Sequence, residues 1–214
     1  MDIAIIGTGN VGSGLATGLV KAGHRVYLAA RESERVEELA ASIGAEAAAN
    51  PAAAAALADV IVLAVPFQAA EEIARSIAPV VNGKTIVDVT NPAKPDWSGP
   101  LFDGTDSGAE RIAAWLPEAR VVKAFNTVFA GNLGDPTPQG IALDGFVAAD
   151  DPAAKAQVLE LASSLGFTPI DAGSLTAARV LEALAWFNIR LNQQPGWTWK
   201  TGWKLVGAPE SRAA

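Results

Sequence analysis

Three glycines near the start of the chain have the spacing of a phosphate-binding loop. Gly7, Gly9 and Gly12 follow an apolar run over 3–6 whose β-branched residues would pack well in a buried strand. In this pattern the first glycine permits a tight turn, the second lets the backbone approach a pyrophosphate, and the third lets the next helix lie close to the strand. The helix expected over about 11–22 would direct its N–H groups and the positive end of its dipole at the phosphates.

The surroundings of this loop favour a dinucleotide site over the alternative, a glycine-rich turn in some other α/β protein. A strand precedes the loop, a helix follows it, and a second strand is expected over 25–30. The predicted contact residues are those of the loop itself: Gly7, Thr8, Gly9, Asn10, Val11 and Gly12.

The end of the second expected strand carries a cation where NAD-binding proteins often carry an acid. An Asp or Glu at this place accepts hydrogen bonds from the ribose 2′-hydroxyl of NAD and would repel a 2′-phosphate. Here the residues are Ala30 and Arg31, and Arg35 follows four positions later, so both guanidinium groups can face one ligand. The pattern favours NADP. The alternative is that both arginines pair with the glutamates at 32, 34, 37 and 38 on a solvated helix.

Later strand ends supply further candidates for cofactor binding. In open α/β sheets the carboxyl ends of the parallel strands meet along one rim, and ligands bind there. Asn91 and Asn126 can offer amide groups to a nicotinamide carboxamide, although a turn or helix-cap role is the alternative for each. Phe67 and Phe125 can offer apolar surface to a ring. The full set of candidates at this rim is Val65, Pro66, Phe67, Asn91, Pro92, Phe125 and Asn126.

No side chain stands out as a catalytic acid or base, so no catalytic residue is predicted. The only tyrosine, Tyr27, lies within the second expected strand, and the only histidine, His24, lies in a turn before it. Lys123 lies near a strand end without an obvious partner. Reduction of a carbonyl usually needs a proton donor beside the hydride acceptor. Hydride transfer between two ring cofactors needs mainly orientation and exclusion of water, which this sequence fits better.

The composition narrows the class of protein. Half of the 214 residues are apolar, there is no cysteine, and the net charge is −7. Disulfides and thiolate chemistry are thereby excluded, and neither a metal site nor a nucleic-acid partner is expected. No apolar stretch is long enough for a membrane span. Because the first expected strand begins at residue 2, no signal peptide is expected, and the cytoplasm is the simplest compartment.

Strand and helix patterns alternate along the chain, which predicts an α/β fold, a Rossmann-type doubly wound parallel sheet with a small C-terminal α/β extension. We expect one domain over 1–214, of which about 141–214 serves the substrate or a dimer interface. A long loop is expected over 93–106, and loops of this length are often functional. Further strands are expected over 46–48, 59–65, 84–89, 120–124, 141–148 and 167–171, and helices over 33–43, 69–78, 109–116, 153–165 and 175–191.

The C-terminal tail is rich in tryptophan. Trp197, Trp199 and Trp203 fall close together, with Lys200 and Lys204 among them. Such residues make platforms for aromatic ligands or anchor partner subunits. The interpretation we favour is that they cap the domain or are buried in a dimer interface.

Taken in order, these motifs resemble the NADP reductases that depend on coenzyme F420. The resemblance covers nearly the whole chain, and its most specific part is the Phe-Asn-Thr sequence at 125–127 after Val-Lys-Ala, with Asp-Ala-Gly at 171–173 downstream. The reductase domain of the STEAP metalloreductases has a similar Phe-Asn motif. The other segments that carry the resemblance are 7–12, 29–31, 64–66, 90–92 and 202–205.

The resemblance implies hydride transfer between C4 of the nicotinamide of NADPH and C5 of a deazaflavin. It also implies that Arg31 and Arg35 match the positions that bind the 2′-phosphate, whereas Ala30 replaces a serine common there. The expected cofactor is therefore NADP, with coenzyme F420 or a flavin-like acceptor as co-substrate, and the expected assembly is a homodimer. Two alternatives stay open: an NADPH-dependent reductase of a small carbonyl, imine or ferric chelate, and a non-catalytic NADP-binding sensor.

Overall fold

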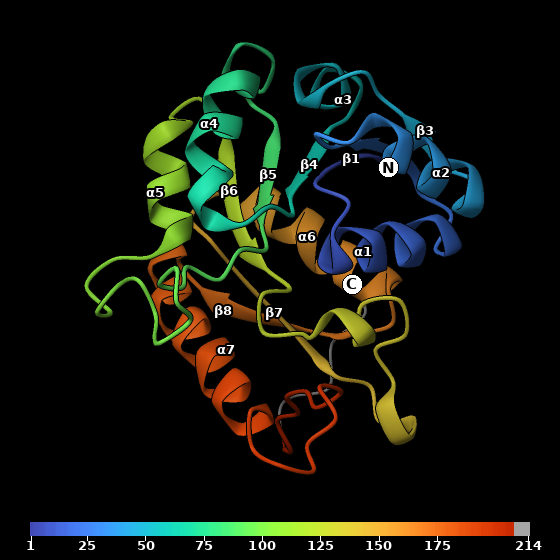
Figure 1. Ribbon diagram of the computed structural model, residues 1–214. Coiled ribbons are helices and arrows are strands. Elements are labelled where there is room, and N and C mark those ends of the chain that lie inside the picture. Colours follow the sequence, from blue (N-terminus) through green and yellow to red (C-terminus); the bar gives the residue numbers. More distant parts are fainter. Residues whose placement is uncertain (208–214) are drawn as a thin grey trace.

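One twisted sheet of eight strands organises residues 1–207, the part of the chain that the computed structural model describes (Figure 1). The strands are β1 (Asp2–Ile6), β2 (Arg25–Ala29), β3 (Glu46–Ala47), β4 (Val60–Leu63), β5 (Thr85–Asp88), β6 (Arg120–Ala124), β7 (Asp144–Ala149) and β8 (Thr168–Gly173). The α-helices are α1 (Asn10–Lys21), α2 (Ser33–Ile43), α3 (Pro51–Leu57), α4 (Phe67–Ile77), α5 (Gly108–Trp115), α6 (Pro152–Ser164) and α7 (Ala178–Asn192).

The strand order is β3-β2-β1-β4-β5-β6-β7-β8. The strands from β3 to β6 in this order all run parallel to one another. Crossover helices on both sides let the central strands be apolar throughout, as in β4, where all four residues are buried. This arrangement confirms the predicted Rossmann-type α/β fold.

Helices cover both faces of the sheet. One core joins α1, α2 and α6 to side chains such as Ile5 and Val62, and the other joins α3, α4 and α5 to the alternate side chains, such as Ile6 and Leu63. The alternation follows from the two-residue period of a strand, which turns successive side chains to opposite faces. Helix α7 packs through Leu181 on the outer part of the sheet, against Phe146 and Ala148 of β7.

The C-terminal part continues the sheet in a direction that the sequence did not reveal. Strand β7 runs antiparallel to β6, and β8 runs parallel to β7. The expected strand over 141–148 therefore begins only at Asp144, which lies at the same rim as the carboxyl end of β6. The last expected helix is also divided, because a 3₁₀ turn over Leu175–Ala177 precedes α7.

Within residues 1–207 no helix combines the length and the hydropathy that crossing a bilayer would require.

Candidate functional site

The glycine loop has the geometry that its sequence predicts. Gly7 has a φ of 108°, and a side-chain carbon there would lie 2.2 Å from the carbonyl oxygen of Ala64. A carbon on Gly12 would lie 1.9 Å from the carbonyl oxygen of Gly7, so α1 packs directly against the loop. Nothing lies within 4 Å of the equivalent position on Gly9, which leaves its backbone open to a ligand.

The beginning of α1 offers unpaired N–H groups beside this opening. Gly9 is the N-cap, no side chain caps the helix, and its first turn contains no acid. The first N–H groups of a helix have no partner inside it and carry partial positive charge. This end of α1 is therefore suited to a pyrophosphate.

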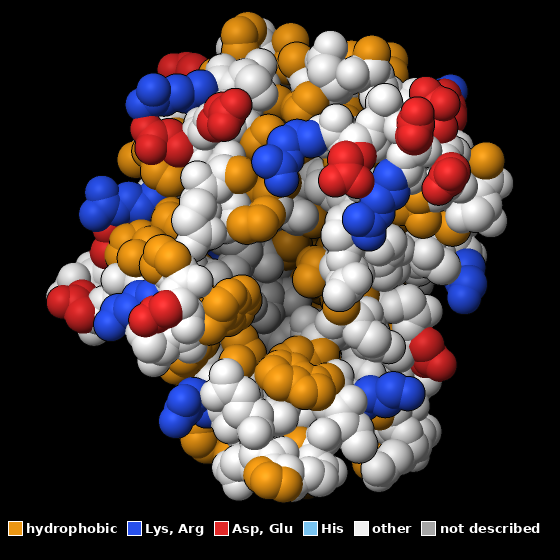
Figure 2. All heavy atoms as spheres, in the orientation of Figure 1, with side chains coloured by type: hydrophobic (Ala, Val, Ile, Leu, Met, Phe, Trp, Pro, Cys, Tyr) orange, Lys and Arg blue, Asp and Glu red, His pale blue; other side chains and the backbone are white. Residues whose placement is uncertain are grey.

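A cavity of about 520 Å³ lies on one side of the loop, at the carboxyl ends of β1, β2 and β4. Figure 2 shows a hollow in this face of the molecule, with basic side chains above it and hydrophobic side chains along its lower rim. The cavity is lined by Ile6, Gly7, Thr8, Gly9, Ala30, Arg31, Glu32, Arg35, Pro51, Ala64, Val65, Pro66, Ala69, Glu72, Ile73 and Ser76.

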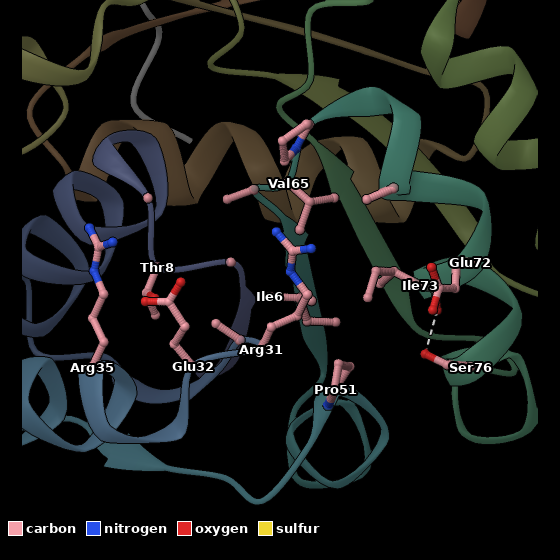
Figure 3. Close-up of a pocket in the computed structure, with 16 residues that line it drawn as sticks. Ile6, Thr8, Arg31, Glu32, Arg35, Pro51, Val65, Glu72, Ile73 and Ser76 are labelled. Carbon is pink, nitrogen blue, oxygen red and sulfur yellow. Dashed lines mark hydrogen bonds between the residues drawn. The ribbon is translucent and has the colours of Figure 1, made fainter.

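The two predicted arginines both line this cavity and are exposed (Figure 3). The alternative assigned them to ion pairs with nearby glutamates. Among residues 1–207, neither Arg31 nor Arg35 has a carboxylate within ion-pair distance. Their guanidinium groups are thus available to an anion, although the carboxylate of Glu32 lies between them in the view of Figure 3.

A second cavity, of about 450 Å³, lies on the other side of the loop. It shares no residue with the first, but Asn10 and Val11 continue directly from Gly9, so the end of α1 separates the two. Its lining residues are Asn10, Val11, Asn91, Trp97, Asn126, Thr127, Val128, Phe129, Ala130, Ala185, Ile189, Gln193 and Trp199.

The predicted asparagines meet in this second cavity. Asn126 Nδ2 donates to Asn91 Oδ1 at 2.9 Å and to the carbonyl oxygen of Leu181 at 3.0 Å, while Asn91 Nδ2 donates to the carbonyl oxygen of Asn126 at 2.8 Å. Oδ1 of Asn126 is buried and has no hydrogen-bond partner among residues 1–207. A buried acceptor without a donor is unusual, and a ligand amide would satisfy it.

The structure places three other predicted residues away from both cavities. The ring of Phe67 packs against Phe102 and Trp115, with centroids 5.6 and 5.8 Å away. Phe125 is 2% exposed and packs against Phe167, because its backbone turns with a φ of 61°. Pro92 is buried beside Gly108. None of these three residues lines either cavity.

Lys123 corrects one interpretation of the sequence, which assigned it no partner. Its Nζ donates to Asp88 Oδ2 at 2.8 Å, to Glu182 Oε1 at 2.9 Å and to the carbonyl oxygen of Thr90 at 2.6 Å. Burial alone would lower the pKa of Lys123, but the two carboxylates outweigh it and raise that pKa. Burial raises the pKa of Glu182 despite the opposing effect of Lys123. The buried cluster ties β5 and β6 to α7.

The residues that sequence reasoning missed come from elements without a motif. Ile73 and Ser76 belong to α4, Ile189 to α7, and Trp97 to the long loop. The only sequence signals for such residues were the length of that loop and the number of tryptophans in the tail. One lysine of the tail has a partner in β7, because Lys204 Nζ lies 2.8 Å from Asp144 Oδ1.

A Rossmann-type sheet with a glycine loop between two cavities defines a dinucleotide-binding protein, and comparison with known proteins identifies its family. Residues 2–92 match the family model of NADP oxidoreductases dependent on coenzyme F420. The chain is 36% identical to the F420-dependent NADP reductase of Methanothermobacter thermautotrophicus over 211 residues, covering 90% of this chain and 89% of that protein. The chain belongs to this family of F420-dependent NADP oxidoreductases.

Two further relatives show how far the likeness extends. A solved structure of a candidate F420-dependent NADP reductase from Arthrobacter sp. FB24 superimposes with a TM-score of 0.86 at 32% identity, covering 96% of this chain and 99% of that one. The metalloreductase STEAP3 of Rattus norvegicus is 34% identical over 91% of this chain, which corresponds to only 37% of that longer protein. The shared part therefore includes the C-terminal strands as well as the glycine loop.

Proposed function

We propose that the protein transfers a hydride between NADPH and the deazaflavin coenzyme F420. The observation that carries this proposal is the likeness to F420-dependent NADP reductases over nine-tenths of the chain, 90% in the case of the Methanothermobacter enzyme. The two cavities on either side of the glycine loop support it, because a dinucleotide laid across the loop reaches into both. In this reaction NADPH loses a hydride to the deazaflavin ring, which also takes one proton from solvent.

The first cavity is proposed to hold the adenosine half of NADPH. Gly7, Thr8 and Gly9 would lie along the pyrophosphate together with the first N–H groups of α1. Arg31 and Arg35 would bind the 2′-phosphate, which an arginine fork suits. Ala69 and Ile73 of α4 would offer apolar surface to the adenine.

The second cavity is proposed to hold the nicotinamide. The unpaired Oδ1 of Asn126 would accept a hydrogen bond from the carboxamide, and Asn91 would hold the Asn126 side chain in place. Asn10 and Val11 would contact the adjoining ribose. Orientation of the two rings and exclusion of water are then the contributions of the protein, and no side chain has to donate a proton.

A spectroscopic assay tests the proposal. Purified protein mixed with NADPH and oxidised coenzyme F420 should bleach the visible absorbance of the deazaflavin, and NADH should be a much poorer donor. Tight binding of NADPH without any bleaching would reject F420 as the acceptor.

A second candidate acceptor is a ferric chelate, and the likeness to STEAP3, which is named a metalloreductase, favours it. NADPH oxidation in the presence of ferric citrate, at a rate exceeding that with coenzyme F420, would select this alternative. An NADP-binding sensor without turnover is the remaining alternative, and turnover with any acceptor would count against it.

The assembly and location are also proposals. The segment from about 141 onward would provide the acceptor side of the site and the interface of a homodimer, because α7 presents exposed apolar residues, among them Val180 and Phe187. A cytoplasmic location is proposed because it would suit a role in exchanging hydride between two diffusible coenzymes. Fractionation of cells that express a tagged chain would test the location.

A further inference from the structure

Two tryptophans at the second cavity have unusual backbone conformations. Trp97 has a φ of 56° and Trp199 has a φ of 57°, and both line the cavity. Bulky residues rarely adopt this left-handed conformation, since the side-chain β-carbon then lies too close to the backbone. The two residues lie on loops 102 positions apart in the chain (199 − 97), so one local sequence effect does not explain both. Observed strain of this kind often accompanies a binding function.

The conformation of Trp199 is held by buried side chains. Asn192 Oδ1 accepts a hydrogen bond from the Trp199 backbone N–H at 3.0 Å, and Asn192 Nδ2 donates to Thr201 Oγ1 at 2.6 Å. Asn132 Nδ2 donates to the carbonyl oxygen of Lys200 at 3.0 Å, and the Thr201 hydroxyl donates to Asn188 Oδ1 at 2.8 Å. The three asparagines are at most 4% exposed. The tail is therefore fixed at this place, and Trp199 is presented in one position.

The indole of Trp199 is supported from one side and open on the other. Its ring meets Phe129 edge-on, with centroids 5.3 Å apart, and the residue is 46% exposed. Trp97 approaches from the long loop, which an isolated bridge between Ala93 and Pro100 closes, and it is 59% exposed. Trp97 and Trp199 line the same cavity, so their exposed indoles form an apolar patch there, and apolar patches often mark a binding site.

The depth of the lining residues divides the cavity into two levels. Asn126, Thr127 and Val128 are at most 7% exposed and form its floor, whereas Trp97 and Trp199 stand at its mouth. With the nicotinamide on the floor beside Asn126, a ring that accepts its hydride must lie face to face with it, nearer the mouth. The mouth is where the two tryptophans are.

We infer that Trp97 and Trp199 form an aromatic clamp that holds the planar fused ring of the acceptor over the nicotinamide. The inference rests on the proposed function for the position of the nicotinamide, and it goes further by assigning acceptor specificity to two residues of this chain. Indole rings bind a flat conjugated ring by stacking or edge contacts, whatever its hydrogen-bonding groups. The clamp selects deazaflavin or flavin rings and gives no comparable contact to a small carbonyl.

Four variants test the clamp. Trp97→Ala and Trp199→Ala remove each indole, Trp199→Phe keeps an aromatic ring, and Trp197→Ala is the matched control. Trp197 lies in the same tail and is 41% exposed, but it lines neither cavity. Calorimetry would measure the dissociation constant of coenzyme F420 for the NADP⁺-loaded protein, and the same titration with NADPH alone would show that each variant is folded and binds its donor.

Each alanine variant should weaken the binding of coenzyme F420 about tenfold, the free-energy equivalent of losing one aromatic contact. Trp199→Phe should retain most of the affinity, Trp197→Ala should bind like the wild type, and NADPH affinity should change by less than about twofold throughout, since none of these indoles is assigned to NADPH. If Trp199→Ala fails to bind NADPH, Trp97→Ala, whose side chain is outside the core, decides the test.

The outcomes separate the clamp from the proposed function. Unchanged affinity for coenzyme F420 in both alanine variants would overturn the clamp. So would a wild-type protein, loaded with NADP⁺, that binds neither coenzyme F420 nor FMN. Binding of coenzyme F420 that depends on the tryptophans, but without hydride transfer from NADPH, would support the clamp and reject the proposed reaction.

Discussion

We expect the choice of coenzyme to depend most directly on Arg31 and Arg35. Both are exposed, both line the first cavity, and neither is in an ion pair within the described residues. Charged hydrogen bonds contribute about 1.5–3 kcal/mol, and exposure favours the lower end. Arg31→Ala should therefore raise the dissociation constant of NADPH about tenfold and leave that of NADH nearly unchanged.

Fluorescence titration with both coenzymes would measure the two constants. Arg75→Ala is a suitable control, because Arg75 is an exposed arginine of α4 that pairs with Glu71 and lines neither cavity. An equal loss of NADPH and NADH affinity in Arg31→Ala would mean that the guanidinium does not recognise the 2′-phosphate.

The strained backbone at Trp97 gives a stability prediction of its own. Trp97→Gly and Trp97→Ala both remove the indole, but only alanine keeps a β-carbon in the left-handed conformation at a φ of 56°. Glycine should therefore be the more stable of the two by about 1 kcal/mol, the reverse of their order in a helix. Urea denaturation of the two variants gives the difference. Equal stability would mean that the loop relaxes and that its conformation is not held.

At the scale of single residues, the sequence predicts the position of a side chain when that position is set by residues close to it along the chain. The glycines and Arg31 have that property, since one loop and one strand end define their position. Phe125 does not, because the left-handed backbone at this residue turns its ring into the core. Trp199 was open to two interpretations for the same reason: its position depends on Asn132 and Asn192, which only the folded chain brings to it.

Among the elements, the junction of β5, β6 and α7 depends on the buried Lys123 cluster. Lys123 and Asp88 are fully buried and the Glu182 side chain is 11% exposed. Removing one partner from such a cluster leaves buried charge without compensation, which costs about 3–5 kcal/mol. Lys123→Met should reduce the free energy of unfolding by about that amount, and the loss should be visible in urea denaturation.

Lys155→Met is the matched control for this variant. Lys155 pairs with Asp171, and their side chains are 16% and 54% exposed, so water screens the carboxylate and the loss of this pair should cost about 1 kcal/mol or less. A similar small loss in both variants would mean that the Lys123 cluster contributes no more than a surface pair.

The stability that two carboxyl groups contribute, Glu110 of α5 and Glu182 of α7, should depend on pH in opposite directions. Burial raises the pKa of Glu182 above its ordinary value of 4.5, so the folded state holds this proton more tightly than the unfolded chain. Stability should therefore fall as pH rises from 4.5 through the folded pKa. Hydrogen bonds from Arg179 lower the pKa of Glu110 below 4.5, so the stability from this pair is present above 4.5 and is lost as pH falls through the folded pKa.

Glu182→Gln isolates the first effect. The advantage of wild type over this variant should grow as pH is lowered toward 4.5, because only the wild type takes up the proton. Urea midpoints for both proteins at several pH values would show it. Parallel pH profiles would exclude a raised pKa at Glu182.

At the scale of elements, the parallel part of the sheet could be predicted from the sequence. In the C-terminal part the presence of two strands and two helices could be predicted, but the direction of the strands could not. Strand β4 is an apolar run between helices, and β5 has an apolar centre and is buried at every position, which is the pattern of a parallel sheet. The direction of β7 has no such local signature, because all six of its residues are buried, as they would be in a parallel strand at this place. Its reversal is what places Asp144 at the rim, where it holds the tail through Leu205 N–H at 2.5 Å.

For the molecule as a whole, the reversal of β7 brings the C-terminal tail to the same rim of the sheet as the glycine loop. The amino end of β7, rather than its carboxyl end, lies beside the end of β6, so the tail meets the same rim as the glycine loop. The long loop reaches that rim from the other side through Trp97. A sequence shows that such a tail and loop exist, but only long-range packing shows that they meet.

The outer face of α7 makes the last prediction, which concerns assembly. Val180 is 68% exposed and Phe187 is 54% exposed, and Leu184 lies between them one helical turn from each. Phe187 also stacks on Trp203 at a centroid distance of 6.1 Å, which extends the apolar face onto the tail. An apolar face of this kind on an outer helix favours a second copy of the chain as its partner.

Phe187→Asp should convert the proposed dimer to a monomer. Burying a phenylalanine contributes about 1.5–3 kcal/mol, and in a twofold interface the substitution removes this side chain from both subunits. The dissociation constant of the dimer should therefore rise by well over a factor of about ten. Sedimentation velocity would measure it. Leu57→Asp, at an equally exposed leucine (56%) on α3, is the control and should leave the assembly unchanged. A wild-type protein that sediments only as a monomer would contradict the proposed interface, whereas a dimer that survives Phe187→Asp would place it on another face.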